Sequence, residues 1–108
     1  MSRLADPHRA LERALSERLA SADAIITASR TQPWASATFS GARHEFELHL
    51  EGQAACRNAQ AFSTKARHAE FDLPGHIVAD FNVRFDSGSP QQNGSAILHI
   101  EALTVEAV

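Results

Sequence analysis

Two four-residue segments carry the residue types best suited to chemistry in this chain of 108 residues. They read Leu-His-Leu-Glu at positions 48–51 and Leu-His-Ile-Glu at positions 98–101, so each places a histidine two residues before a glutamate. Residues two apart in a β-strand point to the same face. Imidazole and carboxylate groups together bind zinc, manganese or iron, and a carboxylate can also orient a histidine for acid–base catalysis. The sequence therefore indicates one divalent-metal or acid–base site, made of His49, Glu51, His99 and Glu101.

This site has a simpler alternative, because histidine and glutamate also alternate on strand faces that only meet solvent. A metal would need a further ligand, which Glu47 or Asp80 could supply if the strands are ordered suitably. We therefore expect no cofactor, with a divalent metal as the alternative.

A second candidate is a small polar and aromatic ligand site. Arg43 and His44 follow a break at positions 40–41, Ser-Gly, and a hairpin there would bring them close to Trp34. Trp34 is the only tryptophan and the chain has no tyrosine, so stacking on a base or sugar would depend on it. The alternative is that Trp34 anchors the core or a dimer interface. The predicted ligand-binding residues are Trp34, Arg43 and His44.

Several functional classes find no support in the sequence. It has no phosphate-binding glycine loop, zinc-protease helix motif, nucleophile elbow or dinucleotide fingerprint. Cys56 is the only cysteine, so neither an intrachain disulfide nor a multi-cysteine zinc site can form, and the cytoplasm is the simplest location. No apolar segment approaches the roughly 18 residues of a spanning helix, which predicts a soluble protein with no membrane partner.

The charge distribution argues against nucleic acid as a partner. Ten Lys and Arg against thirteen Asp and Glu give a net charge of −3. Binding to nucleic acid usually needs a concentrated basic surface, which this balance does not favour. Abundant alanine and arginine are typical of a GC-rich bacterial coding sequence, and we expect a bacterial origin.

Hydrophobic periodicity divides the first half of the chain into a helix and strands. Asp6-Pro7 is typical of a helix start, and leucines at 11, 15 and 19 predict an amphipathic helix. The period then changes to two, which predicts strands at about 24–30, 34–39 and 43–51. The first two form one long strand if the chain only bends at Pro33.

The second half repeats this order. Residues 53–69 have helical spacing with a thin alanine stripe, and a turn follows at 73–75. Alternation predicts a strand at 76–86 that places Ile77, Ala79, Phe81, Val83 and Phe85 on one face. An exposed loop at 86–94 leads to a strand at 95–106, where a change of phase indicates a bulge near Ala102.

We therefore predict a single α+β domain over residues 1–108. Its fold class is a two-layer sandwich, with an antiparallel or mixed sheet of four to five strands, two helices on one face, and the order α-β-β-(β)-α-β-β. With four strands this order resembles a ferredoxin-like βαββαβ unit whose first strand is moved to the C-terminus. In that arrangement the strands at 43–51 and 95–106 would be parallel neighbours at the sheet centre, and the four His and Glu residues would gather on the open face. With five strands the opening order resembles a double-stranded-RNA-binding domain, but the second helix begins without the basic residues that family needs for phosphates.

Three functional classes follow from these features. The first is a non-enzymatic domain that binds a partner or itself, most simply as a homodimer, because exposed sheet edges invite strand pairing across a twofold axis. The second is a metal-dependent or acid–base enzyme using the His and Glu face. The third is a binder of small apolar ligands between helices and sheet, in a pocket lined by Phe62, Phe71, Phe81 and Phe85.

Overall fold

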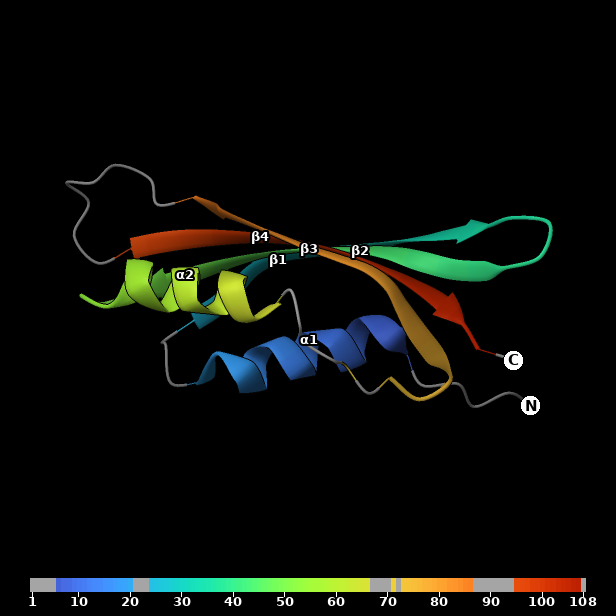
Figure 1. The fold of residues 1–108 in the computed structure, drawn as a ribbon, viewed down its shortest axis with the longest axis horizontal. Coiled ribbons are helices and arrows are strands. Elements are labelled where there is room, and N and C mark those ends of the chain that lie inside the picture. Colours follow the sequence, from blue (N-terminus) through green and yellow to red (C-terminus); the bar gives the residue numbers. More distant parts are fainter. Residues whose placement is uncertain (1–5, 21–23, 67–70, 72, 87–94, 108) are drawn as a thin grey trace.

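The computed structural model describes residues 6–20, 24–66, 71, 73–86 and 95–107 of the chain. Two helices and four strands follow one another in the order α1 (Pro7–Arg18), β1 (Ala24–Ala35), β2 (Ser40–Glu51), α2 (Ala55–Ala66), β3 (His76–Asp86) and β4 (Ser95–Glu106). Both helices lie on the same face of one antiparallel sheet (Figure 1). The predicted two-layer α+β fold is confirmed, in its four-strand form.

Each helix forms for the reason its sequence indicates. Asp6 caps α1 by accepting a hydrogen bond from the backbone N–H of His8 at 2.9 Å, and Pro7 occupies the first turn. Leu11 and Leu15 are fully buried beneath the sheet. In α2 the buried stripe is mostly alanine with Phe62, and small side chains let the helix approach the strands closely. The predicted extension of this helix to residue 69 lies outside the described residues beyond Ala66.

The first two predicted strands are one strand, β1, which runs through Pro33. A proline is tolerated there because β1 is an edge of the sheet, where a missing N–H need not break a ladder. The hairpin turn lies at Ser36–Phe39, and not at the predicted break at 40–41. Its backbone hydrogen bond runs from the N–H of Ser36 to the carbonyl oxygen of Phe39, at 2.8 Å.

The strand order is β1-β2-β4-β3, so the last strand lies at the centre between β2 and β3. The predicted parallel pairing of β2 with β4 is wrong, because these strands are antiparallel. Helix α2 returns the chain so that β3 runs in the direction of β2, and the next strand, β4, then runs against both.

The bulge predicted in the last strand lies instead in its neighbour. β4 pairs with β2 in unbroken register, and its alternation continues with Ala102 and Thr104 both buried. The apolar pattern changes phase only because a polar residue, Thr104, occupies one of the inward-facing positions of β4. The bulge falls between Val78 and Asp80 of β3.

This bulge corrects the predicted inward face of β3. Ile77 lies on the open face and is 57% exposed, whereas Val78 packs against the core. The predicted pattern holds from Phe81 onward, where Phe81, Val83 and Phe85 pack against the core. A second bulge lies in β1 between Ile26 and Ala28.

The core fills only part of the long sheet. The molecule measures 50 × 23 × 23 Å, and the β1–β2 hairpin extends beyond both helices (Figure 1). Helix α1 contacts β1, while α2 contacts β3, β4 and β2. Neither of the two described helices has the length and apolar character that crossing a membrane requires. Both described helices leave the opposite face of the sheet uncovered, and its side chains point outward.

Candidate functional site

The open face of the sheet gathers charged side chains from all four strands. In β2, Phe46 and Leu48 point to the core, so Glu45, Glu47 and His49 point the other way. The register then fixes their neighbours. Glu45 lies opposite Arg30 of β1 and Glu101 of β4, and Glu47 lies opposite His99.

The predicted His and Glu quartet is only partly brought together. Both histidines approach Glu47, a residue considered from sequence only as an additional ligand. The Nε2 atom of His49 lies 3.3 Å from one carboxylate oxygen of Glu47, and the Nδ1 atom of His99 lies 3.8 Å from the other.

The two glutamates of the quartet lie away from this cluster. Glu51 is opposite Ser95 at the end of β2, and Glu101 is opposite Glu45. Antiparallel pairing causes this separation, since the two His-Xaa-Glu segments run in opposite directions. Within the described part of the chain, no three His, Cys, Asp or Glu side chains are grouped so that they could hold a metal ion.

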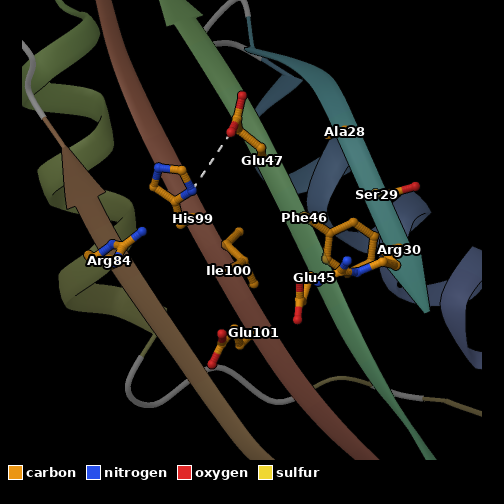
Figure 2. A pocket seen from close by; sticks show the side chains of 10 residues that line it. All are labelled: Ala28, Ser29, Arg30, Glu45, Phe46, Glu47, Arg84, His99, Ile100 and Glu101. Carbon is orange, nitrogen blue, oxygen red and sulfur yellow. Dashed lines mark hydrogen bonds and ion pairs between the residues drawn. The ribbon is translucent and has the colours of Figure 1, made fainter. Parts of the chain in front are cut away.

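A groove of about 420 Å³ lies beside this cluster on the open face (Figure 2). Ala28 follows the bulge in β1 and has a small side chain, which leaves room above β2. One wall carries Arg30, whose Nη2 atom lies 2.7 Å from an oxygen of Glu45. The charged residues lining the groove are Arg30, Glu45, Glu47, Arg84, His99 and Glu101.

The predicted ligand site around Trp34 is divided by the sheet. Trp34 lies opposite Gly41, on the open face with Arg43, whereas His44 points to the helices. A Cβ atom at Gly41 would lie 3.0 Å from the indole Nε1 of Trp34 and would overlap the carbonyl oxygen of Thr104. The indole thus lies over a position where a side chain does not fit. Its Nε1 atom is buried and finds no hydrogen-bond partner among the described residues.

His44 belongs to a buried polar network that the sequence interpretation missed. Its side chain is fully buried. Its Nε2 atom lies 2.9 Å from the hydroxyl of Thr104, and its Nδ1 atom lies 3.0 Å from Nδ1 of His8 and 3.3 Å from the hydroxyl of Thr31. The available signal was its spacing, since His44 has the same strand parity as Phe46, Leu48 and Leu50.

The hydrogen bonds determine which ring nitrogens carry protons. The Thr104 hydroxyl donates to the carbonyl oxygen of Ala42 at 3.3 Å, so it accepts a hydrogen bond from Nε2–H of His44. The Nδ1 atom of His44 is then an acceptor, and Nδ1–H of His8 donates to it. The two rings lie nearly coplanar, at 18°, and edge to edge, with centroids 5.3 Å apart.

Burial lowers the pKa of His44 from 6.5 to about 4. The nearby imidazole of His8 adds to this effect and Asp6 opposes it, while His76 lowers the pKa further. His44 is therefore neutral at physiological pH, in agreement with its acceptor nitrogen.

The phenylalanines of the predicted apolar pocket lie at the helix–sheet boundary. Phe62 is buried in the core, and the rings of Phe71 and Phe81 pack on each other with centroids 4.8 Å apart. Phe81 borders a hollow of about 280 Å³ between α2 and β3. Its other lining residues are largely polar and include Gln60, Ser63, Thr64 and Asn82.

Comparisons with protein-family models, with curated proteins and with solved structures found no match to this chain.

Proposed function

We propose that the protein is a non-enzymatic binding domain that works as a homodimer, in which the β1 strands of two copies pair. The observation that supports this most is the free edge of β1, where every residue from Thr27 to Pro33 is exposed. An exposed strand edge presents unpaired backbone donors and acceptors to another strand. A cytoplasmic location and a bacterial origin stay predictions from composition.

The two edges of the sheet differ in how well they resist pairing. Edge strand β3 carries Asp80 and Arg84 and contains a bulge next to Asp80, and charges and bulges both discourage strand addition. In β1 the regular segment 28–32 has one charge, Arg30. That side chain is drawn over β2 by its ion pair with Glu45. β1 is therefore the edge that favours a partner strand.

The flank of α1 next to β1 adds charge complementarity to a second copy. Arg9, Glu12, Arg13 and Ser16 border a hollow of about 380 Å³ against Ile26 of β1. If the two α1 helices run antiparallel across the dimer axis, Glu12 faces the partner's Arg13, and Arg13 faces the partner's Glu12. Strand pairing alone buries less than the roughly 1,200 Å² of a typical stable interface, so this flank supplies the remaining contact area.

The open face of the sheet is a poor surface for contact with a second copy of the chain. Glu45, Glu47 and Glu101 lie near its centre, and stacking two open faces would bring carboxylates against carboxylates. Repulsion between like charges disfavours that arrangement. The twofold arrangement that the charges favour is therefore edge to edge.

Sedimentation velocity and light scattering at several concentrations test this proposal. The double variant Ala28→Lys with Gln32→Lys places two further cations beside Arg30 on the β1 edge, so we expect a monomer. The matched control, Ala79→Lys with Asn82→Lys, adds the same charges to the β3 edge and should remain dimeric like the parent. A parent protein that stays monomeric at high micromolar concentration, or a β1 variant that stays dimeric, would overturn the proposal.

A second candidate function is acid–base catalysis at Glu47, or divalent-metal binding there once His49 and His99 turn towards a common point, because as placed the described side chains do not form a metal site. It is favoured by one specific observation, the position of this carboxylate between His49 and His99. Calorimetric titration of untagged protein with zinc tests the metal form. Stoichiometric binding lost in the His49→Ala and His99→Ala variants, but kept in His76→Ala, would support it, and an absence of binding would exclude it.

A further inference from the structure

Two charges along the open-face groove, those of Glu101 and Arg84, have no ion-pair partner among the described residues. Glu45 and Glu101 lie directly opposite each other on β2 and β4, an unfavourable position for two carboxylates. Arg30 forms an ion pair with Glu45. Within the described residues, Glu101 forms no ion pair, and it points into the groove (Figure 2).

A positively charged residue without an ion-pair partner among the described residues lies on the other side of the groove from Glu45. Arg84 of β3 lies opposite His99 of β4, and no described carboxylate forms an ion pair with it. Asn82 faces Glu101, so Arg84 and Glu101 are diagonal neighbours on adjacent strands. Diagonal neighbours lie about 7–8 Å apart, which is within the combined reach of two long side chains and a small molecule between them.

The shape of the groove suits a small ligand. Its volume of about 420 Å³ lies within the usual range of small-molecule sites, and its floor is formed where β2 and β4 pass Phe46 and Ile100, whose side chains are buried in the core. Glu45 and Glu101 lie at one end together with Arg30, and Arg84 and His99 lie at the other end together with Glu47 (Figure 2).

We propose that the open-face groove binds a small zwitterion, whose ammonium group lies between Glu45 and Glu101 and whose carboxylate lies against Arg84 and His99. The ammonium group would relieve the repulsion between the facing carboxylates. The carboxylate would accept paired hydrogen bonds from the guanidinium, the geometry in which arginine binds carboxylates best. α-Amino acids are the simplest ligands with both groups.

Ligands with only one of these charges fit less well. A simple anion would meet three carboxylates, and a simple cation would leave Arg84 without a counter-ion. With three glutamates and two arginines along the groove, a basic side chain on the ligand is preferred to an acidic one. The groups proposed to hold the ligand are on β2, β3 and β4, whereas the proposed dimer pairs the β1 edges, although Ala28 and Arg30 of β1 also line the groove.

The test is an NMR titration of ¹⁵N-labelled protein with L-leucine and with two matched ligands. Isopentylamine lacks the carboxylate of leucine, and 4-methylpentanoate lacks its ammonium group. We expect saturable amide shifts at residues 45–47 and 99–101 with L-leucine, and at least tenfold weaker binding of each matched ligand. No saturable shift up to about 20 mM L-leucine, well above a millimolar dissociation constant, would overturn the proposal.

Variants then assign the contacts. Arg84→Gln and Glu101→Gln should each weaken L-leucine binding about tenfold, since each removes one charge-assisted contact. The matched controls, Arg57→Gln and Glu17→Gln, change the same residue types at exposed helical positions and should bind like the parent. Equal binding by leucine and either matched ligand, or unchanged binding by both groove variants, would refute the zwitterion site.

Discussion

The Nδ1 atoms of His8 and His44 lie 3.0 Å apart, with one imidazole in the first turn of α1 and the other in β2. The ring of His8 also stacks on Phe46, with centroids 4.8 Å apart and an interplanar angle of 11°. This pair joins the start of α1 to the inner face of the sheet. Only one of the two facing nitrogens can hold the shared proton, and because the pKa of His44 is lowered to about 4, the donor at neutral pH is His8.

Stability should therefore fall as the solution becomes more acidic. The pKa of His44 is lowered to about 4 in the folded protein, so between pH 6.5 and about 4 the unfolded chain binds a proton that the folded chain does not. The stabilisation is complete above pH 6.5 and is lost as the pH falls towards 4, a change of about 3 kcal/mol from this group alone. Urea unfolding at a series of pH values measures it.

The pH effect has a matched control on the other face of the sheet. His44→Gln should lower stability at pH 7.5 but flatten its dependence on pH between 6.5 and 4. His49→Gln, which alters a half-exposed histidine on the open face, should keep the parental slope. The same slope in His44→Gln as in the parent would show that another group is responsible.

Substitutions of His44 and Thr104 are expected to have non-additive effects on the free energy of unfolding, because the two side chains share a hydrogen bond. Thr104→Val keeps the side-chain shape but leaves the buried Nε2–H of His44 without an acceptor, which should cost about 1–3 kcal/mol of unfolding free energy. In a His44→Phe background the donor is gone, and the same change should cost much less. A double-mutant cycle by chemical denaturation measures the difference. Additive effects of the two changes would contradict the hydrogen bond.

Gly41→Ala should destabilise the protein by about 1–3 kcal/mol, because the new methyl group would overlap the backbone of Thr104 and touch the indole of Trp34. The fluorescence of the single tryptophan should shift as the ring is displaced. Ser40→Ala, at the exposed neighbouring position, is the control and should leave both the melting temperature and the spectrum unchanged. A stable Gly41→Ala variant with an unshifted spectrum would show that the two strands can separate there.

Removing the ion pair between Arg30 and Glu45 should have little effect on stability. The Arg30 side chain is 73% exposed, and exposed ion pairs contribute at most about 1 kcal/mol. We expect Arg30→Gln to lower the free energy of unfolding by less than this amount in a urea titration. A larger loss would mean that Arg30 has a structural contact beyond this pair.

Local patterns were sufficient to predict the elements and most of their faces. The alternation of Phe46, Leu48 and Leu50 with glutamates identified the core and open faces of β2 correctly. Pattern alone could not locate the bulge in β3, because Ile77 and Val78 are both apolar and either can face the core. The same limit applies to Pro33, whose effect depends on whether its strand is at an edge.

The candidate site was harder to predict because it depends on strand direction. The two Leu-His-Xaa-Glu segments correctly identified two neighbouring central strands. Periodicity, however, does not indicate whether neighbouring strands run parallel or antiparallel. That direction decides that Glu47, and not Glu51, meets His99. His44 was expected at a hairpin beside Trp34 because it follows the Ser-Gly break at 40–41, although its spacing already placed it with the core residues.

The central place of β4 also has a consequence for how the molecule is made. This strand follows the other three in the chain, yet it is the only strand that pairs with β3 in the described sheet and it joins β3 to the β1–β2 hairpin. Until β4 is synthesised, β2 and β3 each have an open side, and the sheet cannot close. Contacts between β2 and β4 join residues far apart in sequence, which slows folding. During synthesis the incomplete chain is therefore the form most exposed to aggregation and most in need of a chaperone.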